Sequence, residues 1–180
     1  MKKFLYAIPA ALLFFCVSCD NEKNEGGMSD KAKKNLEVSA AITKCFESGD
    51  WSKIGDYIAA DAVDHAGMNG DIVGLDSIKA AFAMYSTMMS DMKNETVKEF
   101  ADDDYVMQWI KESWTMKVDG MGMKAGSRNT LNAIEVSKFK DGKSTEHWSF
   151  ISWGDMMKMM PQPPMDNKMM DNKMDTTKPK

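Results

Sequence analysis

The stretch 105–118, YVMQWIKESWTMKV, has the residue types of a long strand, and alternation along a strand sorts its side chains into two faces. One face is mostly apolar; its members are Val106, Gln108, Ile110, Glu112, Trp114, Met116 and Val118. The opposite face carries Trp109. The stretch therefore predicts a strand whose core face holds a carboxylate, Glu112, between large apolar side chains.

Strand patterns continue on both sides of this stretch, from Glu95 to Trp153. The flanking segments are ETVKEFA (95–101), SRNTLNAIEVSKF (127–139) and STEHWSFISW (144–153), and the turn KDGK (140–143) joins the last two. Because each segment is followed by turn residues rather than by a helix, the sequence predicts an antiparallel sheet.

Three helices are predicted before the sheet, over 29–49, 51–60 and 75–89. The third has an apolar stripe at helical spacing, formed by Leu75, Ile78, Phe82, Tyr85 and Met89. Helices that precede an antiparallel sheet indicate an α+β fold. We expect the N-terminal helices to pack in the concave face of a strongly curved antiparallel sheet, which leaves a cone open at one end.

The N-terminus, MKKFLYAIPAALLFFCVSCD, has the charged start and short apolar run of a secretory signal peptide. We predict a signal peptide over 1–18, lipidation of Cys19, and a flexible stalk over 19–30. The protein would then be a lipoprotein anchored to a membrane of the bacterial cell envelope. The alternative is an ordinary cleaved signal that leaves Cys19 as a free cysteine.

Charge and cysteine content limit the partners. Loss of Lys2 and Lys3 with the signal changes the formal charge from −4 to −6, and an acidic chain without a basic cluster argues against nucleic-acid binding. Cys45 lies on the apolar stripe of the first predicted helix, so we expect a core thiol. The spacing of the residues shows no zinc site and no phosphate-binding loop, and we expect no cofactor.

The C-terminal segment 156–180 is rich in methionine and contains a tandem MDNKM repeat. It has no periodic apolar face, so we predict a disordered low-complexity tail. Methionine thioethers are soft ligands that suit Cu(I). Binding of Cu(I) or Ag(I) by this tail is therefore an alternative function.

Five segments resemble the successive landmarks of the SnoaL-like branch of the NTF2-like (cystatin-like cone) superfamily. They are YIAADAVDHAG (57–67), GLDSIKAAF (74–82), FADDDYVMQWI (100–110), GMGMKAGSR (120–128) and FKDGKSTEHW (139–148). The resemblance implies an NTF2-like cone over 31–155, and places His65 near the cavity rim, on the first strand. Polyketide cyclases of this branch commonly have an acidic residue after the Glu-His-Trp triplet, whereas this chain has Ser149. That departure argues against cyclase chemistry.

The candidate catalytic residues are His65, Glu112 and Glu146, with Glu135 as a further substitute. A carboxylate on an apolar face acquires a raised pKa unless the strand edge exposes it to water. His65 could exchange a proton at neutral pH, or it could be a loop histidine held by backbone hydrogen bonds.

The last strand carries a second histidine, His147. Because Trp148 and Phe150 share a face, we expect that face to be the core, with Glu146 on the same side and His147 at the surface.

The leading hypothesis is a binding module that holds a small apolar or amphipathic ligand in the cone, with the membrane contacted through the lipid anchor. We expect Tyr85, Trp109, Trp114 and Trp148 to contact the ligand. The alternative is an isomerase or cyclase that moves a proton by acid–base catalysis. A homodimer through the sheet is an additional partner hypothesis.

Overall fold

The computed structural model describes residues 27–159. The predicted signal peptide, Cys19, most of the stalk and the tail from residue 160 onward lie outside the described residues. Within residues 27–159, no helix combines the length and the apolar character needed to cross a membrane.

The first helix, α1 (Asp30–Ser48), begins and ends where the sequence predicts. Ser29 is the N-cap, and its hydroxyl accepts the backbone N–H of Ala32 at 3.0 Å. Gly49 ends the helix with a φ of 68°, a left-handed conformation that glycine adopts without steric cost. The buried Asn35 donates to the carbonyl of Asp103 at 3.0 Å and so fixes α1 against the turn that follows β3.

The second predicted helix is much shorter than expected. Only α2 (Ile54–Tyr57) is helical, and the chain continues as strand β1 (Ile58–Asp64). Ile54, Ile58 and Ala62 are all buried and lie four residues apart, a spacing that also suits one helix face. Periodicity alone therefore could not separate helix from strand here. The pairing of β1 with the last strand, which is distant in sequence, decides the conformation.

The remaining elements follow the predicted order: β2 (Ile72–Val73), α3 (Leu75–Met88), β3 (Met89–Ala101), β4 (Tyr105–Met116), β5 (Arg128–Lys140), β6 (Lys143–Ile151) and α4 (Trp153–Met159). Strand β3 starts six residues before the predicted Glu95, directly after α3. The predicted turn between β5 and β6 is present, and Asp141 and Gly142 have φ values of 51° and 77°.

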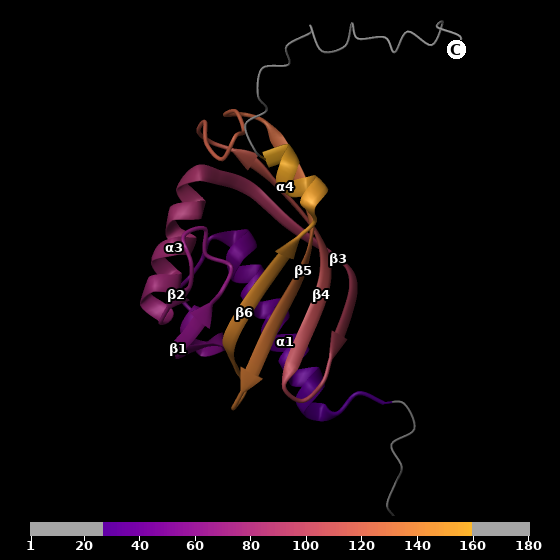
Figure 1. The fold of residues 1–180 in the computed structure, drawn as a ribbon. Coiled ribbons are helices and arrows are strands. Elements are labelled where there is room, and N and C mark those ends of the chain that lie inside the picture. The colour runs from indigo at the N-terminus through magenta and orange to yellow at the C-terminus, as the bar shows by residue number, and fades with distance from the viewer. Residues whose placement is uncertain (1–26, 160–180) are drawn as a thin grey trace, which may run out of the picture.

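The six strands form one sheet in the order β2-β1-β6-β5-β4-β3, with α1 and α3 on one side of it and α4 at its upper end (Figure 1). The expected α+β fold with a curved sheet is confirmed. All pairs are antiparallel except β1 and β6, which run parallel. Helix α1 packs against β3, β4 and β6, and α3 packs against β1, β2 and β3, so the helices and the sheet enclose a common space.

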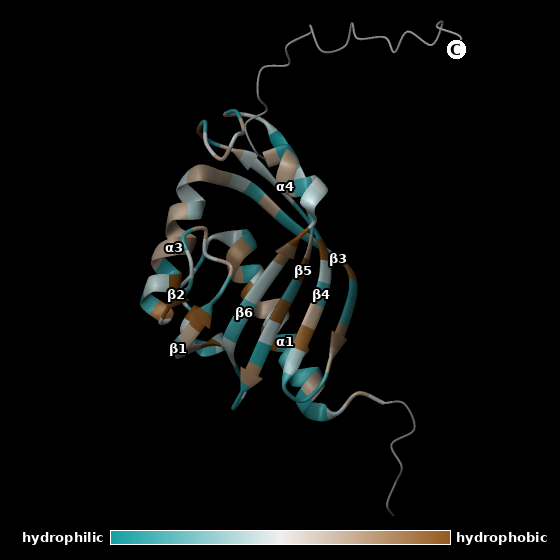
Figure 2. Cartoon of the chain, in the orientation of Figure 1, coloured by the Kyte–Doolittle hydropathy of each residue, from teal (hydrophilic) through white to brown (hydrophobic). Residues whose placement is uncertain are grey.

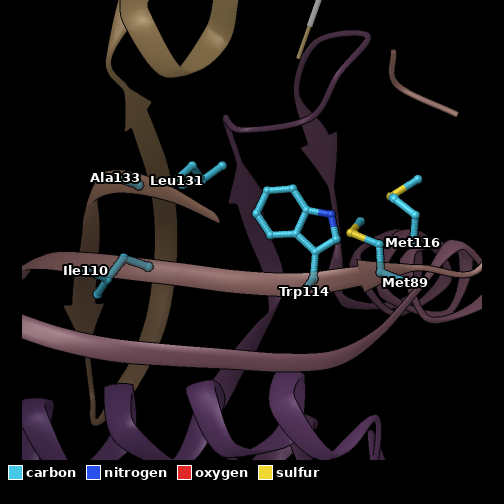
Figure 3. Packing of buried hydrophobic residues seen from close by; sticks show 6 residues of the cluster. All are labelled: Met89, Ile110, Trp114, Met116, Leu131 and Ala133. Carbon is cyan, nitrogen blue, oxygen red and sulfur yellow. The ribbon is translucent and has the colours of Figure 1, made fainter. Parts of the chain in front are cut away.

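Hydrophobic and hydrophilic positions alternate along the long strands (Figure 2). One apolar cluster surrounds Trp114 on β4 and includes Met89, Ile110, Met116, Leu131 and Ala133 (Figure 3). A second cluster, formed by Ile54, Ile58, Ala62 and Ile78, joins α2, β1 and α3. Cys45 is half-buried against the second cluster, as its place on the apolar stripe predicts. The inward face predicted for β4 is confirmed, except that Val118 lies beyond the strand and is exposed.

Candidate functional site

A cavity of about 320 Å³ lies between the helices and the concave side of the sheet. Its walls are mainly apolar and include Ile42, Phe46, Ile78, Phe82, Ile110 and Leu131. Ionisable side chains also line it, and four strands supply one each: Asp64, Glu112, Glu135 and His147. The cavity therefore combines an apolar volume with a compact polar wall, the usual composition of a small-molecule site.

His147 is the centre of the polar wall. Its Nδ1 lies 3.0 Å from Asp64 Oδ1, and its Nε2 lies 2.8 Å from Glu135 Oε2. Ser149 donates to the other oxygen of Glu135 at 2.7 Å, and the backbone N–H of Ala66 donates to Asp64 at 3.0 Å. The imidazolium form can satisfy both carboxylates at once, because both of its ring nitrogens carry hydrogen.

These contacts fix the charges of the wall. Burial by itself would lower the pKa of His147, but the hydrogen bonds to Asp64 and Glu135 and the charges of these carboxylates raise it to about 9. Burial opposes ionisation of Asp64, yet the hydrogen bond and charge of His147 hold the pKa of Asp64 below its ordinary value. At neutral pH the structure therefore contains an imidazolium held between carboxylates.

Glu112 behaves differently from the other carboxylates. Burial, with a smaller contribution from the charge of Glu135, raises the pKa of Glu112 to about 7. Within the described residues, Glu112 makes no hydrogen bond and no ion pair that would stabilise its charged form. Glu112 thus exchanges its proton near neutral pH while it faces the cavity.

Tyr85 of α3 adds a neutral hydrogen-bonding group to the cavity. Burial and the charge of Asp64 raise the pKa of its phenol, so Tyr85 keeps its proton at neutral pH.

The predicted orientation of β6 was wrong. His147, Ser149 and Ile151 line the cavity, whereas Phe150 is 57 % exposed on the outer face of the sheet. The size of the aromatic side chains suggested the core, but pairing decides otherwise: Ser149 lies opposite Glu135, and both point inward. A register irregularity leaves Thr145 without a partner in the pairing of β5 with β6 and interrupts the alternation.

His65 lies just beyond the end of β1 and is not among the residues that line the cavity. Its ring stacks on Trp148 with centroids 4.8 Å apart, and its Nδ1 lies 3.0 Å from Asp71. Glu146 borders the cavity but is engaged by Lys138 at 2.6 Å, with His65 Nε2 at 3.5 Å. The structure therefore does not bring the three predicted catalytic candidates together, because only Glu112 faces the cavity unpaired.

Of the four aromatic residues expected to contact the ligand, two line the cavity and two do not. Tyr85 and Trp114 line the cavity. Trp109 is 48 % exposed on the outer face of β4, and Trp148 stacks on His65 outside the cavity lining, so the expectation that these two line the cavity is not met.

Sequence reasoning missed three of the wall's members as a unit: Asp64, His147 and Ser149. A usable signal was present on β5, where Leu131, Ala133, Glu135 and Ser137 share a face with buried Phe139.

Within residues 27–159, no group of three His, Cys, Asp or Glu side chains is arranged to hold a metal ion. The tail proposed to bind Cu(I) or Ag(I) lies outside the described residues, apart from the part of it in α4.

Comparison with known proteins agrees with this geometry. The family described as SnoaL-like polyketide cyclase matches residues 37–163, which is most of the chain. The chain belongs to this family. No curated protein sequence matches it.

Solved structures share the fold at low sequence identity. A SnoaL-like protein from a Jannaschia species aligns with a TM-score of 0.66 and 13% identity, over 77% of this chain and 99% of its own. A SnoaL-like polyketide cyclase from Agrobacterium tumefaciens gives 0.60 and 13%, over 69% and 95%. An LEH-like epoxide hydrolase from M. tuberculosis gives 0.60 and 13%, over 72% and 90%. Similarity at this level establishes a shared fold but not a shared reaction, because the reaction depends on the residues that line the cavity of each protein.

Proposed function

We propose that this SnoaL-like domain is an acid–base enzyme of the isomerase or cyclase type, in which Glu112 moves a proton on a small, mostly apolar carbonyl compound. One observation carries the proposal: a carboxyl group with a pKa of about 7 faces an apolar cavity without a partner among the described residues. A group whose pKa lies near the working pH is suited to both accept and return a proton.

His147 has a supporting role in this proposal. Both of its ring nitrogens are engaged by carboxylates, so it cannot accept a substrate proton without first losing one of its own. The imidazolium instead balances the charges of Asp64 and Glu135, and the Glu135 charge is the one that raises the pKa of Glu112. Ser149 occupies the position at which the resemblance predicts an acidic residue. It donates a hydrogen bond to Glu135 of the neighbouring strand, so a carboxylate still lies beside this position.

The proposed step is removal of a proton from the carbon next to a carbonyl group. The Glu112 carboxylate accepts this proton, and the electron pair of the broken C–H bond forms a C=C bond as the carbonyl π pair moves onto oxygen. Isomerisation follows when the proton returns to a different carbon, and cyclisation follows when the enolate carbon attacks a second carbonyl. Neither route consumes an oxidant or a reductant.

Deuterium exchange tests the proposal directly. Small ketones are incubated with the protein in deuterated water, and incorporation next to the carbonyl is followed by NMR. We expect Glu112→Gln to reduce the catalysed exchange rate by about 10²- to 10⁴-fold, the usual contribution of a general acid–base group. Glu37→Gln is the matched control, because Glu37 is exposed on α1.

Binding of the ketones without exchange would overturn the enzyme proposal and favour the binding module predicted from the sequence. Equal exchange rates in wild type and Glu112→Gln would assign the proton transfer to another group.

We also propose that the protein is exported and anchored to a membrane of the cell envelope through lipidated Cys19. The support is the charged, apolar and small-residue order of the N-terminal sequence. Metabolic labelling with a fatty-acid probe tests this proposal, and loss of the label in Cys19→Ala, with retention in Cys45→Ala, is the expected result.

A homodimer through the outer face of the sheet is a third proposal. Exposed apolar side chains gather there: Val97, Phe100, Met107, Trp109 and Phe150 are 48, 60, 44, 48 and 57 % exposed. Contiguous apolar surface of this kind marks interaction sites. Glu95 of β3 lies opposite Lys111 of β4 in the strand register, on the same face. In a dimer with a two-fold axis, Glu95 of one copy can therefore approach Lys111 of the other.

A further inference from the structure

Trp114 has a hydrogen-bond donor that no described residue accepts. Its side chain is 3 % exposed, and its indole Nε1 is buried without a partner. Leaving a buried N–H unpaired costs free energy, because the group gives up its hydrogen bond to water and gains none in return. Buried polar groups are nearly always satisfied, so such a donor requires an explanation.

The position of the indole suggests the explanation. Trp114 lines the cavity and stands two residues after Glu112 on the same face of β4. The indole nitrogen lies on the side of the ring that faces Met89 and Met116 (Figure 3), and Met89 also lines the cavity. Methionine side chains are unbranched and change rotamer readily. A small shift of a methionine can therefore open the N–H to an oxygen atom in the cavity.

We infer that Trp114 binds the carbonyl oxygen of the substrate through its indole N–H and stabilises the negative charge that develops on this oxygen when Glu112 removes the neighbouring proton. The inference rests on the proposed function for its catalytic part. Its binding part, a site for a neutral oxygen acceptor, stands on the unpaired donor alone.

The chemistry needs a donor at this place. Proton removal from carbon moves an electron pair onto the carbonyl oxygen, and an N–H in an apolar site stabilises that charge more strongly than it does in water. An indole N–H is a donor only, so it cannot form a favourable hydrogen bond to a ligand group that is itself only a donor. The inferred ligand class is therefore a mostly apolar ketone or a related carbonyl compound, rather than a hydrocarbon or an ammonium compound.

Two probes of nearly equal shape test the inference: benzylacetone, which is a ketone, and butylbenzene, in which a methylene replaces the carbonyl. The ¹H–¹⁵N signal of the Trp114 indole is assigned with Trp114→Phe. We expect this signal to move downfield with benzylacetone and to move little with butylbenzene. The indole signal of Trp109, on the outer face, serves as the internal reference.

Affinities of the two probes give a second, independent measurement. Trp114→Phe removes both the N–H and part of the ring, but the loss of ring surface weakens both probes alike. We expect the ratio of ketone to hydrocarbon affinity to fall about tenfold in this variant. An unchanged ratio, an equal response of the indole signal to both probes, or no binding of benzylacetone would overturn the inference. If Trp114→Phe does not fold, the Trp114 indole signal is assigned by elimination, with Phe replacing each of the other tryptophans in turn, and its response in the wild type decides alone.

The same probes separate this inference from the proposed function. Loss of deuterium exchange in Glu112→Gln together with an unchanged probe ratio in Trp114→Phe would retain the enzyme and reject the oxygen site. A ketone-specific indole shift, with exchange unaffected in Glu112→Gln, would retain the oxygen site and reject Glu112 as the proton-transfer group.

Discussion

Nε2 of His147 lies 2.8 Å from Oε2 of Glu135, and the two residues come from neighbouring antiparallel strands. This contact joins the last strand to the middle of the sheet inside the cavity rather than on the surface. Asp64 closes the arrangement from β1 by contacting the other ring nitrogen. Three strands therefore share one charged hydrogen-bonded unit, so a change at His147 affects both the packing of the sheet and the electrostatics of the cavity.

The charge on His147 predicts a stability that depends on pH. The pKa of His147 is raised from 6.5 to about 9 in the folded protein, so its stabilising contribution is fully present below pH 6.5 and is lost as the pH rises through 9. Thermal unfolding of the wild type should show that its free energy of unfolding falls as the pH rises from 6.5 to 9. His147→Gln should be destabilised by about 1–3 kcal/mol at neutral pH, because it leaves carboxylates poorly paired.

The matched control for this experiment is His65→Gln, which removes the histidine that lies outside the cavity. It should retain the fall in stability across that pH range. The same slope in wild type and in His147→Gln would contradict the assignment of the charge to His147.

The titration of Glu112 predicts the pH dependence of catalysis. Its pKa is raised from 4.5 to about 7, so the carboxylate that accepts a proton becomes abundant only as the pH rises through 7. Exchange of a ketone should accelerate over that range and level off above it. The sign for stability is opposite: the contribution of Glu112 is present below pH 4.5 and is lost as the pH rises through 7. A rate that is constant from pH 5 to 8 would exclude Glu112 as the base.

The outer face of the sheet predicts a self-associating protein. Trp109→Glu places a charge at the centre of the exposed apolar surface, so sedimentation should show a dimer for the wild type and a monomer for the variant. Met84→Glu is the control, since Met84 is 43 % exposed on α3, away from the sheet. A monomeric wild type at high protein concentration would reject the proposed dimer.

The C-terminal helix predicts where the domain ends. Asp155 accepts hydrogen bonds from Ser152 at 3.0 Å and from the backbone N–H of Asn132 at 3.3 Å, which fixes α4 to β5. Contacts with Lys158, Asn132 and Ser152 hold the pKa of Asp155 at about 2, so its contribution is present above pH 3.8 and is lost as the pH falls through 2. Truncation after residue 160 should leave the thermal midpoint nearly unchanged, whereas Asp155→Ala should lower it. A large loss on truncation would show that the tail contributes to the fold.

Local signals in the sequence predicted much of the fold. The Ser29 cap and Gly49 define α1, and the Asp141–Gly142 turn defines the last hairpin, because these residues act through nearby backbone geometry. Glu112 was also predictable, since its neighbours on the strand are apolar and the strand has a single inward face.

The rest depended on pairing between distant segments. The conformation of Ile58 and its neighbours follows from contact with β6, some ninety residues later, which no local pattern reveals. The orientation of His147 follows from its position opposite Ser137. The large aromatic side chains of the same strand suggested the opposite orientation, because they lie on the outer face and not in the core. The site was therefore predicted only in part: Glu112 lies in it, but His147 and Asp64 come from faces that the sequence did not determine.

The curvature of the sheet has a consequence for how the acidity of Glu112 is maintained. Glu112 pairs with Leu131, four residues from Glu135, a separation of about 13 Å along a flat strand. Nevertheless the charge of Glu135 contributes to the pKa of Glu112, and β3, the edge strand beside β4, carries two pairing irregularities. The pKa of Glu112 therefore depends on how strongly the sheet curves, because curvature brings Glu135 closer to Glu112. Substitutions on the outer face of β3 that flatten the strand should therefore change the pKa of Glu112 without replacing any residue that lines the cavity.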